Sequence, residues 1–259
     1  MATDSDITEE EYLATGWEDD APRGDTVVRN ALRAMADRLA AWADAAGGRV
    51  HREDGLVLTD AASPNLFINQ ALVARRLDEE LARRVVEFYP AERPMLLMTP
   101  RDTPDLRPTG LALMGHPPFM VRAAGGEPPP LPAGVTVHEV TTPDELAVWD
   151  GVVADGFPMP LSPAPPSLLG GPSRFWLAMV DGQPAGASAA ATDHGVTDVE
   201  AVATLPAYRG RGVGAAVTWA ATLADRAVPA VLIASDLGRG VYERMGYLAV
   251  MRWTLWYRE

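Results

Sequence analysis

Apolar positions near the start of the chain follow the period of a helix. Between residues 27 and 45 they recur every three or four positions, at Val28, Leu32, Met35, Leu39 and Trp42. This spacing predicts an amphipathic helix, which the glycine pair at 47–48 would end. The same period predicts a second helix at about 71–89. Short strands are expected at 55–59 and 65–69, and apolar runs predict buried strands at 95–99 and 118–122.

The pattern is interrupted by AAGGEPPPLPAG at 123–134. Two glycines followed by a proline run predict a stiff, extended linker. Acidic residues dominate the first 25 positions, which are typical of a solvated arm. We therefore divide the chain into an arm at 1–25, a first domain at 26–123, a linker at 124–134 and a second domain at 135–259.

Strands and helices alternate in the second half. A strand is predicted at 135–140, followed by a helix that opens with a Thr/Asp cap in TPDELAVWDGVVADGF. Antiparallel strands are expected at 174–180, 184–192 and 196–204, a helix at about 212–226, a strand at 230–235, a short helix near 239–245 and a last strand at 248–257. The predicted class is α/β, of the α+β mixed-sheet type.

Composition excludes several kinds of chemistry. The 259 residues include no cysteine and no lysine, which removes thiolate nucleophiles, cysteine-held metals, the lysine-bearing phosphate loop and lysine Schiff bases. The formal net charge of −13 disfavours nucleic acid and suits a cationic or amine-bearing small substrate. No apolar stretch is long enough for a membrane span, and the acidic start carries no basic, apolar signal, so we expect a cytoplasmic protein.

An anion site is predicted where the strand at 196–204 turns into the next helix. Glycines at 210, 212 and 214 let an anion approach the backbone, and the first turn of the helix offers unpaired amides with a partial positive charge. Two ligands fit. Gly210–Ala215 matches the dinucleotide fingerprint, with Asp236 placed as the ribose-binding acid, which would make the chain a nicotinamide- or flavin-dependent oxidoreductase. Antiparallel hairpins before the turn argue against that fold, so we rank it second.

The other ligand follows from a family resemblance. The segment from Arg209 to Gly214 fits R/Q-x-x-G-x-G/A, and VYERMGY at 241–247 follows in the expected element order. Over about 135–257 the chain resembles the Gcn5-related N-acetyltransferases, the GNAT superfamily. The resemblance implies the GNAT fold, with acetyl-CoA or another acyl-CoA as cosubstrate and direct transfer to an amine in a ternary complex.

Site residues follow from the same resemblance. Main-chain groups of Val202, Ala203 and Thr204 would pair with pantetheine. Ser235 stands seven residues before the tyrosine, where the family commonly has an asparagine, and this departure puts one cofactor contact in doubt. The pyrophosphate would lie on the amides of Arg209, Gly210, Arg211, Gly212, Val213, Gly214 and Ala215.

Tyr242 would be the general acid that protonates the departing CoA thiolate. A base must also take a proton from the acceptor ammonium. By strand alternation Asp198, Glu200, Val202 and Thr204 would share one face, so an acid there would point toward the thioester. Glu200 is our first choice and Asp198 the second.

The remaining features concern the acceptor and the first half. Apolar residues in the proline-rich loop at 156–173 favour an acceptor with a hydrophobic part, and four scattered histidines give no reason to expect a metal. The element order of 26–123 resembles a degenerate GNAT half without cofactor that shapes the acceptor cleft, as in tandem members of the superfamily. A non-catalytic acyl-CoA-binding module is a further alternative. Acceptor identity, acyl preference and oligomeric state stay open.

Overall fold

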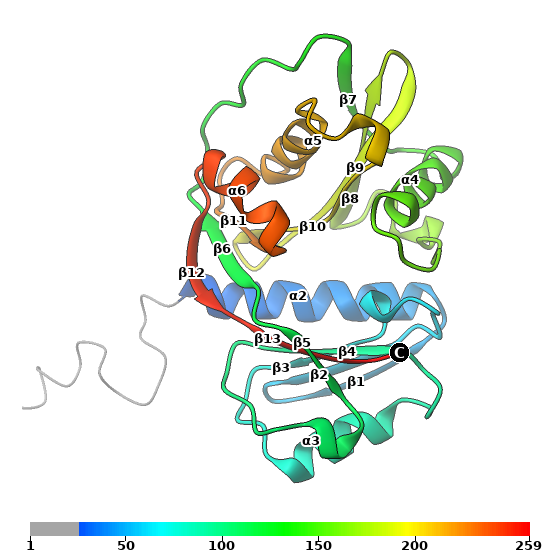
Figure 1. Ribbon diagram of the computed structural model, residues 1–259, viewed down its shortest axis with the longest axis vertical. Helices are drawn as coiled ribbons and strands as arrows, with labels where there is room; N and C mark the ends of the chain where they lie inside the picture. The colour runs from blue at the N-terminus through cyan, green and yellow to red at the C-terminus, as the bar shows by residue number, and fades with distance from the viewer. Residues whose placement is uncertain (1–25) are drawn as a thin grey trace, which may run out of the picture.

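Two mixed β-sheets, with the long helix α2 (Thr26–Ala45) between them, make up the molecule (Figure 1). The computed structural model describes residues 26–259, so the expected acidic arm lies outside the described residues. The first sheet has the order β1 (Arg49–Glu53), β2 (Leu56–Asp60), β3 (Gln70–Val73), β4 (Met95–Thr99), β13 (Thr254–Arg258) and β5 (Ala112–Gly115). The second has the order β12 (Leu248–Arg252), β6 (Pro118–Arg122), β11 (Ala230–Ile233), β10 (Val196–Thr204), β9 (Gln183–Asp193), β8 (Ser173–Val180) and β7 (Val135–Glu139). The expected mixed-sheet α/β class is confirmed.

Each half of the chain gives one strand to the sheet of the other half. β6 precedes the linker but lies between β11 and β12, and β13 follows it but lies between β4 and β5. The single strand expected at 248–257 is therefore wrong: the chain breaks at Trp253 and enters a different sheet. The linker separates the halves in sequence but does not separate the two sheets.

The two sheets repeat one pattern of strand directions. From β1 to β5 the successive neighbours pair antiparallel, antiparallel, parallel, antiparallel and antiparallel. From β8 through β9, β10, β11 and β6 to β12 they pair in the same sequence of directions. The parallel pair β3–β4 thus corresponds to β10–β11, and the helix between each pair corresponds as well.

Helices cover both faces of each sheet. α3 (Glu79–Phe88) packs on one face of the first sheet, and α2 on the other. In the second sheet α5 (Val213–Thr222) and α6 (Asp236–Arg244) cover one face, whereas α4 (Pro143–Gly156) covers the other. Thr142 caps α4, as predicted, and Glu145 completes a capping box with it.

The helix expected at 71–89 is shorter than predicted. Residues 70–73 are instead the fully buried strand β3, and Asp78 caps α3 by accepting a hydrogen bond from the Leu81 amide. A short apolar run fits either a strand or a helix, and here its place in the sheet decides. Likewise, 65–69 is a short 3₁₀ turn and not a strand.

A shared hydrophobic core holds the two halves together. It joins residues of α2, such as Met35 and Leu39, to Leu96 of the first sheet and to Phe119 and Val231 of the second. Within residues 26–259, no helix combines the length and apolar character that crossing a membrane requires.

Candidate active site

The turn at residues 209–212, where pyrophosphate binding is predicted and which we call the phosphate turn, leads from β10 to α5 and contains two glycines in left-handed conformation. Gly210 has φ 75° and Gly212 has φ 80°, values that side-chain-bearing residues rarely adopt. Gly212 is the N-cap of α5 and provides no side-chain cap, in contrast to the carboxylate that caps α3. The amides of the first turn of α5 are therefore open to an anion.

The two arginines of this turn are engaged with the protein. Nε of Arg209 donates to the Thr204 carbonyl at 3.2 Å, and its Nη2 donates to the Gly156 carbonyl at 3.0 Å. The Arg211 guanidinium lies 5.6 Å from the centre of the Tyr208 ring. Arg209 thus ties the end of β10 to the end of α4, so an anion here would be met by backbone amides more than by arginine charge.

β10 separates from β11 as it approaches the turn. The parallel pairing covers Thr197 and Asp198 alone, although β10 continues to Thr204. The edge that follows offers main-chain groups to an extended ligand. Val202, Ala203 and Thr204 lie on this edge, where pairing with pantetheine is predicted.

A β-bulge interrupts the alternation of β10. The pairing with β9 shifts register between Glu200 and Ala203, and Ala201 has φ 48°. Val202 consequently joins Val199 in the core beneath α5, and Thr204 also faces α5. The prediction that Asp198, Glu200, Val202 and Thr204 share one face is therefore wrong, because the bulge places the last two on the opposite face.

A cavity of about 1290 Å³ joins these elements. The phosphate turn lines it, with the exception of Arg211, and so do β10 from Asp198 to Thr204 and Ser235 and Tyr242 of the α6 region. The first half supplies part of the wall through α2 and the segments 65–70 and 114–117. Most of the predicted site residues thus surround one cavity, and both halves of the chain build it.

Glu200 lies beside two charged groups inside the cavity wall. It is ion-paired with Arg38 of α2, whose Nε also donates to Asp198 Oδ2 at 2.9 Å. The side chain of Glu200 keeps 31 % of its surface exposed, whereas Asp198 keeps 1 %. The pKa of Glu200 is raised overall. Burial has the largest effect and the charge of Asp198 adds to it, whereas the charge of Arg38 acts in the opposite direction. A base of this kind exchanges protons closer to neutral pH than an ordinary glutamate.

Tyr242 lines the cavity from α6. Burial raises the pKa of its hydroxyl to about 12, so the phenol stays protonated at neutral pH. Its ring packs edge-on against Tyr247, with 6.0 Å between ring centres. Ser235 caps α6, and its Oγ accepts a hydrogen bond from the Gly238 amide at 3.1 Å. The serine oxygen is therefore already engaged at the start of the helix.

The charged residues of the cavity wall that sequence reasoning missed include Arg38 and Asp150. Arg38 continues the apolar stripe of α2, between Met35 and Trp42, and a basic residue within such a stripe is the signal that could have revealed it. Asp150 of α4 is buried, and its Oδ1 accepts a hydrogen bond from the Ala164 amide at 2.9 Å. Burial raises the pKa of Asp150 to about 6.

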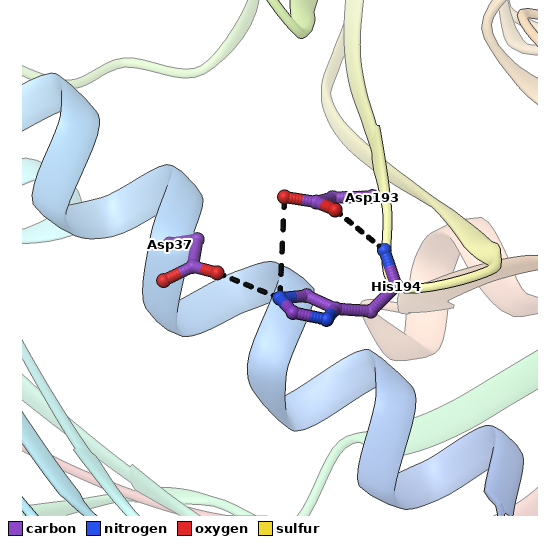
Figure 2. Close-up of side chains that lie close together, drawn as sticks. All are labelled: Asp37, Asp193 and His194. Atoms are coloured by element: carbon purple, nitrogen blue, oxygen red, sulfur yellow. Dashed lines mark hydrogen bonds and ion pairs between the residues drawn. The ribbon is translucent and has the colours of Figure 1, made fainter.

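The structure brings one histidine close to two acids on the surface. Nε2 of His194, in the β9–β10 turn, donates to Oδ2 of Asp37 of α2 at 2.7 Å, with Asp193 beside it (Figure 2). Asp37 also pairs with Arg52 at 2.7 Å. An arginine within the group argues against a cation there, so we describe these contacts as a clasp between α2 and the second half.

Part of the second half matches a known family model. Residues 171–248 match the family model of the acetyltransferase (GNAT) domain. No curated protein matches the sequence. The fold order around the turn, an antiparallel hairpin followed by one parallel neighbour, also differs from the repeated parallel units of a dinucleotide-binding fold.

Solved structures share the fold along most of the chain. A GCN5-related N-acetyltransferase from Kribbella flavida is 23% identical with a TM-score of 0.63, and the match covers 86% of this chain and 94% of that one. One from Sphaerobacter thermophilus is 16% identical with a TM-score of 0.53, covering 87% and 91%. A GCN5-related N-acetyltransferase-like protein from Streptococcus suis is 15% identical with a TM-score of 0.53, covering 88% and 98%. The chain therefore has the GNAT fold, and its residues 171–248 match the model of the acetyltransferase (GNAT) domain.

Proposed function

We propose that the chain transfers an acetyl group from acetyl-CoA to the amine of a small molecule. The observation that carries the proposal is the common cavity: the uncapped start of α5, the free edge of β10, the carboxylate of Glu200 and the phenol of Tyr242 all line it. The match of residues 171–248 to the GNAT domain model supports an acyl-CoA-dependent acyltransferase. The small-molecule acceptor is our inference from the enclosed site.

The cofactor would be held largely by backbone. Amides from Arg209 to Ala215 would receive the pyrophosphate, and hydrogen bonds to a charged group contribute about 1.5–3 kcal/mol each. Pantetheine would extend along the free edge of β10 beyond the bulge. The bulge turns main-chain groups of Ala201 and Val202 out of the ladder with β9, close to the place where the thioester would lie.

Transfer would need two protons removed from the acceptor nitrogen, one before it attacks the thioester and one as the tetrahedral intermediate collapses to the amide, and one proton supplied to the sulfur. Glu200 would accept the proton of the acceptor ammonium, directly or through water, since only the neutral amine attacks. Tyr242 would donate its hydroxyl proton to the departing thiolate. A phenol whose pKa is raised by burial stays protonated until the thiolate forms. Proton exchange with solvent would then reprotonate Tyr242 and deprotonate Glu200.

The acceptor side of the cavity is largely apolar. Its wall includes Met35, Leu39 and Trp42 of α2, together with Phe67 and Trp149. An amine with an apolar body would bury that body against these side chains, at about 25 cal/mol for each Å² removed from water. The charge of −13 would favour the approach of a cation.

One cofactor site per chain is part of the proposal. The helix of the first half that corresponds to α5 is α3, and it is capped by Asp78 with Glu79 and Glu80 in its first turn. Three carboxylates at that end would repel a pyrophosphate. The repeated strand directions and this altered helix start both support a degenerate GNAT half at residues 26–123.

Calorimetric titration with acetyl-CoA, and with NADH in parallel, tests the proposal. We expect one acetyl-CoA site per chain and no heat from NADH. Turnover on a panel of apolar amines and of polar polyamines is then followed by a thiol reagent, which reports released CoA alone because the chain contains no cysteine. NADH binding without acetyl-CoA binding would overturn the proposal, and acetyl-CoA binding without turnover on any amine would favour the binding module.

A further inference from the structure

Arg38 belongs to the first half of the chain, yet its guanidinium lies between two carboxylates of the second half. Nε donates to Asp198 Oδ2 at 2.9 Å, and Nη2 is paired with Oε1 of Glu200. The Arg38 side chain is 8 % exposed. Both acids are far from Arg38 in sequence, since 160 positions separate Arg38 from Asp198.

The geometry gives the two carboxylates different tasks. Asp198 is almost fully buried and holds Nε, which fixes the plane of the guanidinium. The outer nitrogen is then directed to Glu200, which is the more exposed of the two acids and opens on the cavity. A planar fork that binds two acids at once is a property of arginine that lysine lacks.

The charge of Arg38 would also favour the ionised form of Glu200. One guanidinium faces two carboxylates, so a net charge of −1 remains when both acids are ionised. Without Arg38, two neighbouring acids on one strand face would share a proton, which raises the pKa of the pair. Other ionisable groups that line the cavity are His116, Asp150, Tyr208, Arg209, Asp236, Tyr242 and Arg244.

Contacts on either side of Arg38 fix α2 against β10. The residue next to Arg38 is Asp37, which pairs with His194 of the β9–β10 turn and with Arg52 of β1. Apolar residues on the other side of Arg38, including Met35 and Leu39, belong to the core shared by the two sheets. The helix is thus fixed against β10 both by surface pairs and by packing.

We propose that Arg38 is a positioning residue for the base Glu200, so that the first half of the chain completes the active site of the second. The proposal rests on the proposed acetyl transfer, and it goes further by assigning a catalytic contribution to the half that lacks a cofactor site. Arg38 acts through Glu200: it orients the carboxylate and keeps it ionised.

A double-mutant cycle tests this relationship. We compare Arg38→Leu, Glu200→Gln and the double variant, with Arg33→Leu, an exposed arginine of the same helix, as the control. Arg38→Leu should lower kcat by about 10- to 100-fold while the KM for acetyl-CoA stays within about twofold, because a general base contributes about this much or more. In the Glu200→Gln background the same change should lower kcat no further. Losses that multiply would overturn the proposal. Arg38→Lys should restore part of kcat.

Titration of the carboxyl carbon of Glu200 by ¹³C NMR separates this proposal from the function itself. Arg38→Leu should raise the pKa of Glu200, and Asp198→Asn should lower it, with the acid limb of kcat/KM moving in the same two directions. Unchanged titration in both folded variants would overturn the role of Arg38. Wild-type protein without turnover on any amine would instead overturn the acetyl transfer, and the NMR result would still decide what Arg38 does to Glu200. If Arg38→Leu does not fold, Arg38→Gln takes its place in both measurements.

Discussion

Pro132 of the linker lies against Gly212 of the phosphate turn: a Cβ on Gly212 would meet Cγ of Pro132 at 2.8 Å. The linker therefore passes directly beside the turn, and its residue Pro129 lines the cavity. Both the φ of 80° and this close approach require glycine at position 212. The linker and the proposed cofactor site are neighbours.

Gly212→Glu should abolish acetyl-CoA binding, because it adds bulk and negative charge where the pyrophosphate would bind. We expect affinity to fall by at least about 10- to 100-fold, the equivalent of one lost hydrogen bond to a charged group. Calorimetry measures it. Gly182→Glu is a matched control, since Gly182 has φ 78°, faces open space and lies in the β8–β9 turn away from the cavity. Equal affinity in the two variants would contradict the site.

Tyr242→Phe should lower kcat by about 10- to 100-fold or more and leave acetyl-CoA affinity unchanged, because the phenol would act as a general acid and not as a ligand. Steady-state kinetics with calorimetry separates the two effects. Tyr247→Phe is the control: Tyr247 does not line the cavity, and its hydroxyl lies 2.7 Å from Thr222 Oγ1 in the core. That variant should keep kcat and lose about 1 kcal/mol of stability. A normal kcat in Tyr242→Phe would exclude the proposed acid.

Asp150 should make stability depend on pH. Its pKa is raised by burial to about 6, above the ordinary 3.8, so the ionised form is less favourable in the folded chain than in the unfolded one. The stability that it contributes is complete below pH 3.8 and is lost as the pH rises through 6. Asp150→Asn can still accept the Ala164 hydrogen bond, and its melting temperature should exceed that of the wild type by more at pH 8 than at pH 5. Asp155→Asn, an exposed acid of the same helix, should show no such difference.

The exchanged strands should make each half dependent on the other. A fragment of residues 124–259 lacks β6, the strand between β11 and β12, and carries β13 without its partners β4 and β5. We expect this fragment alone to aggregate or to lose acetyl-CoA binding, because it exposes open strand edges. Co-expression with residues 26–123 should restore soluble protein that binds acetyl-CoA. Full binding by the isolated fragment would show that β6 is dispensable.

Local chemistry of the sequence is sufficient to predict the conformation of the turn at residues 209–212. Glycines at 210 and 212 adopt the left-handed conformations that favour this residue, and α5 starts directly after Gly212. Strand alternation also predicts correctly that Asp198 and Glu200 share a face. The alternation fails after Glu200, where the bulge lies. A bulge depends on how β9 and α5 pack around β10, and it produces no recognisable pattern of apolar residues in the sequence.

Features that join distant segments could not be predicted in the same way. The runs at 118–122 and 254–258 are identifiable as strands, but an apolar pattern shows that a strand is buried and not which neighbour it pairs with. The role of Arg38 could not be predicted for the same reason, since its partners lie on β10 in the other half. The strand exchange and the contacts of Arg38 both follow from one arrangement, in which the two halves share a core and the proposed active-site cavity.

The position of β13 also determines the order in which the chain can fold during synthesis. β13 is made after β1 to β12, yet it lies inside the first sheet, where it pairs with both β4 and β5. At 5–20 residues per second, a delay on the order of ten seconds separates the synthesis of β5 from that of β13. Throughout that delay the first sheet lacks the strand that lies between β4 and β5, so β5 can reach its native pairing only after the second half has been translated.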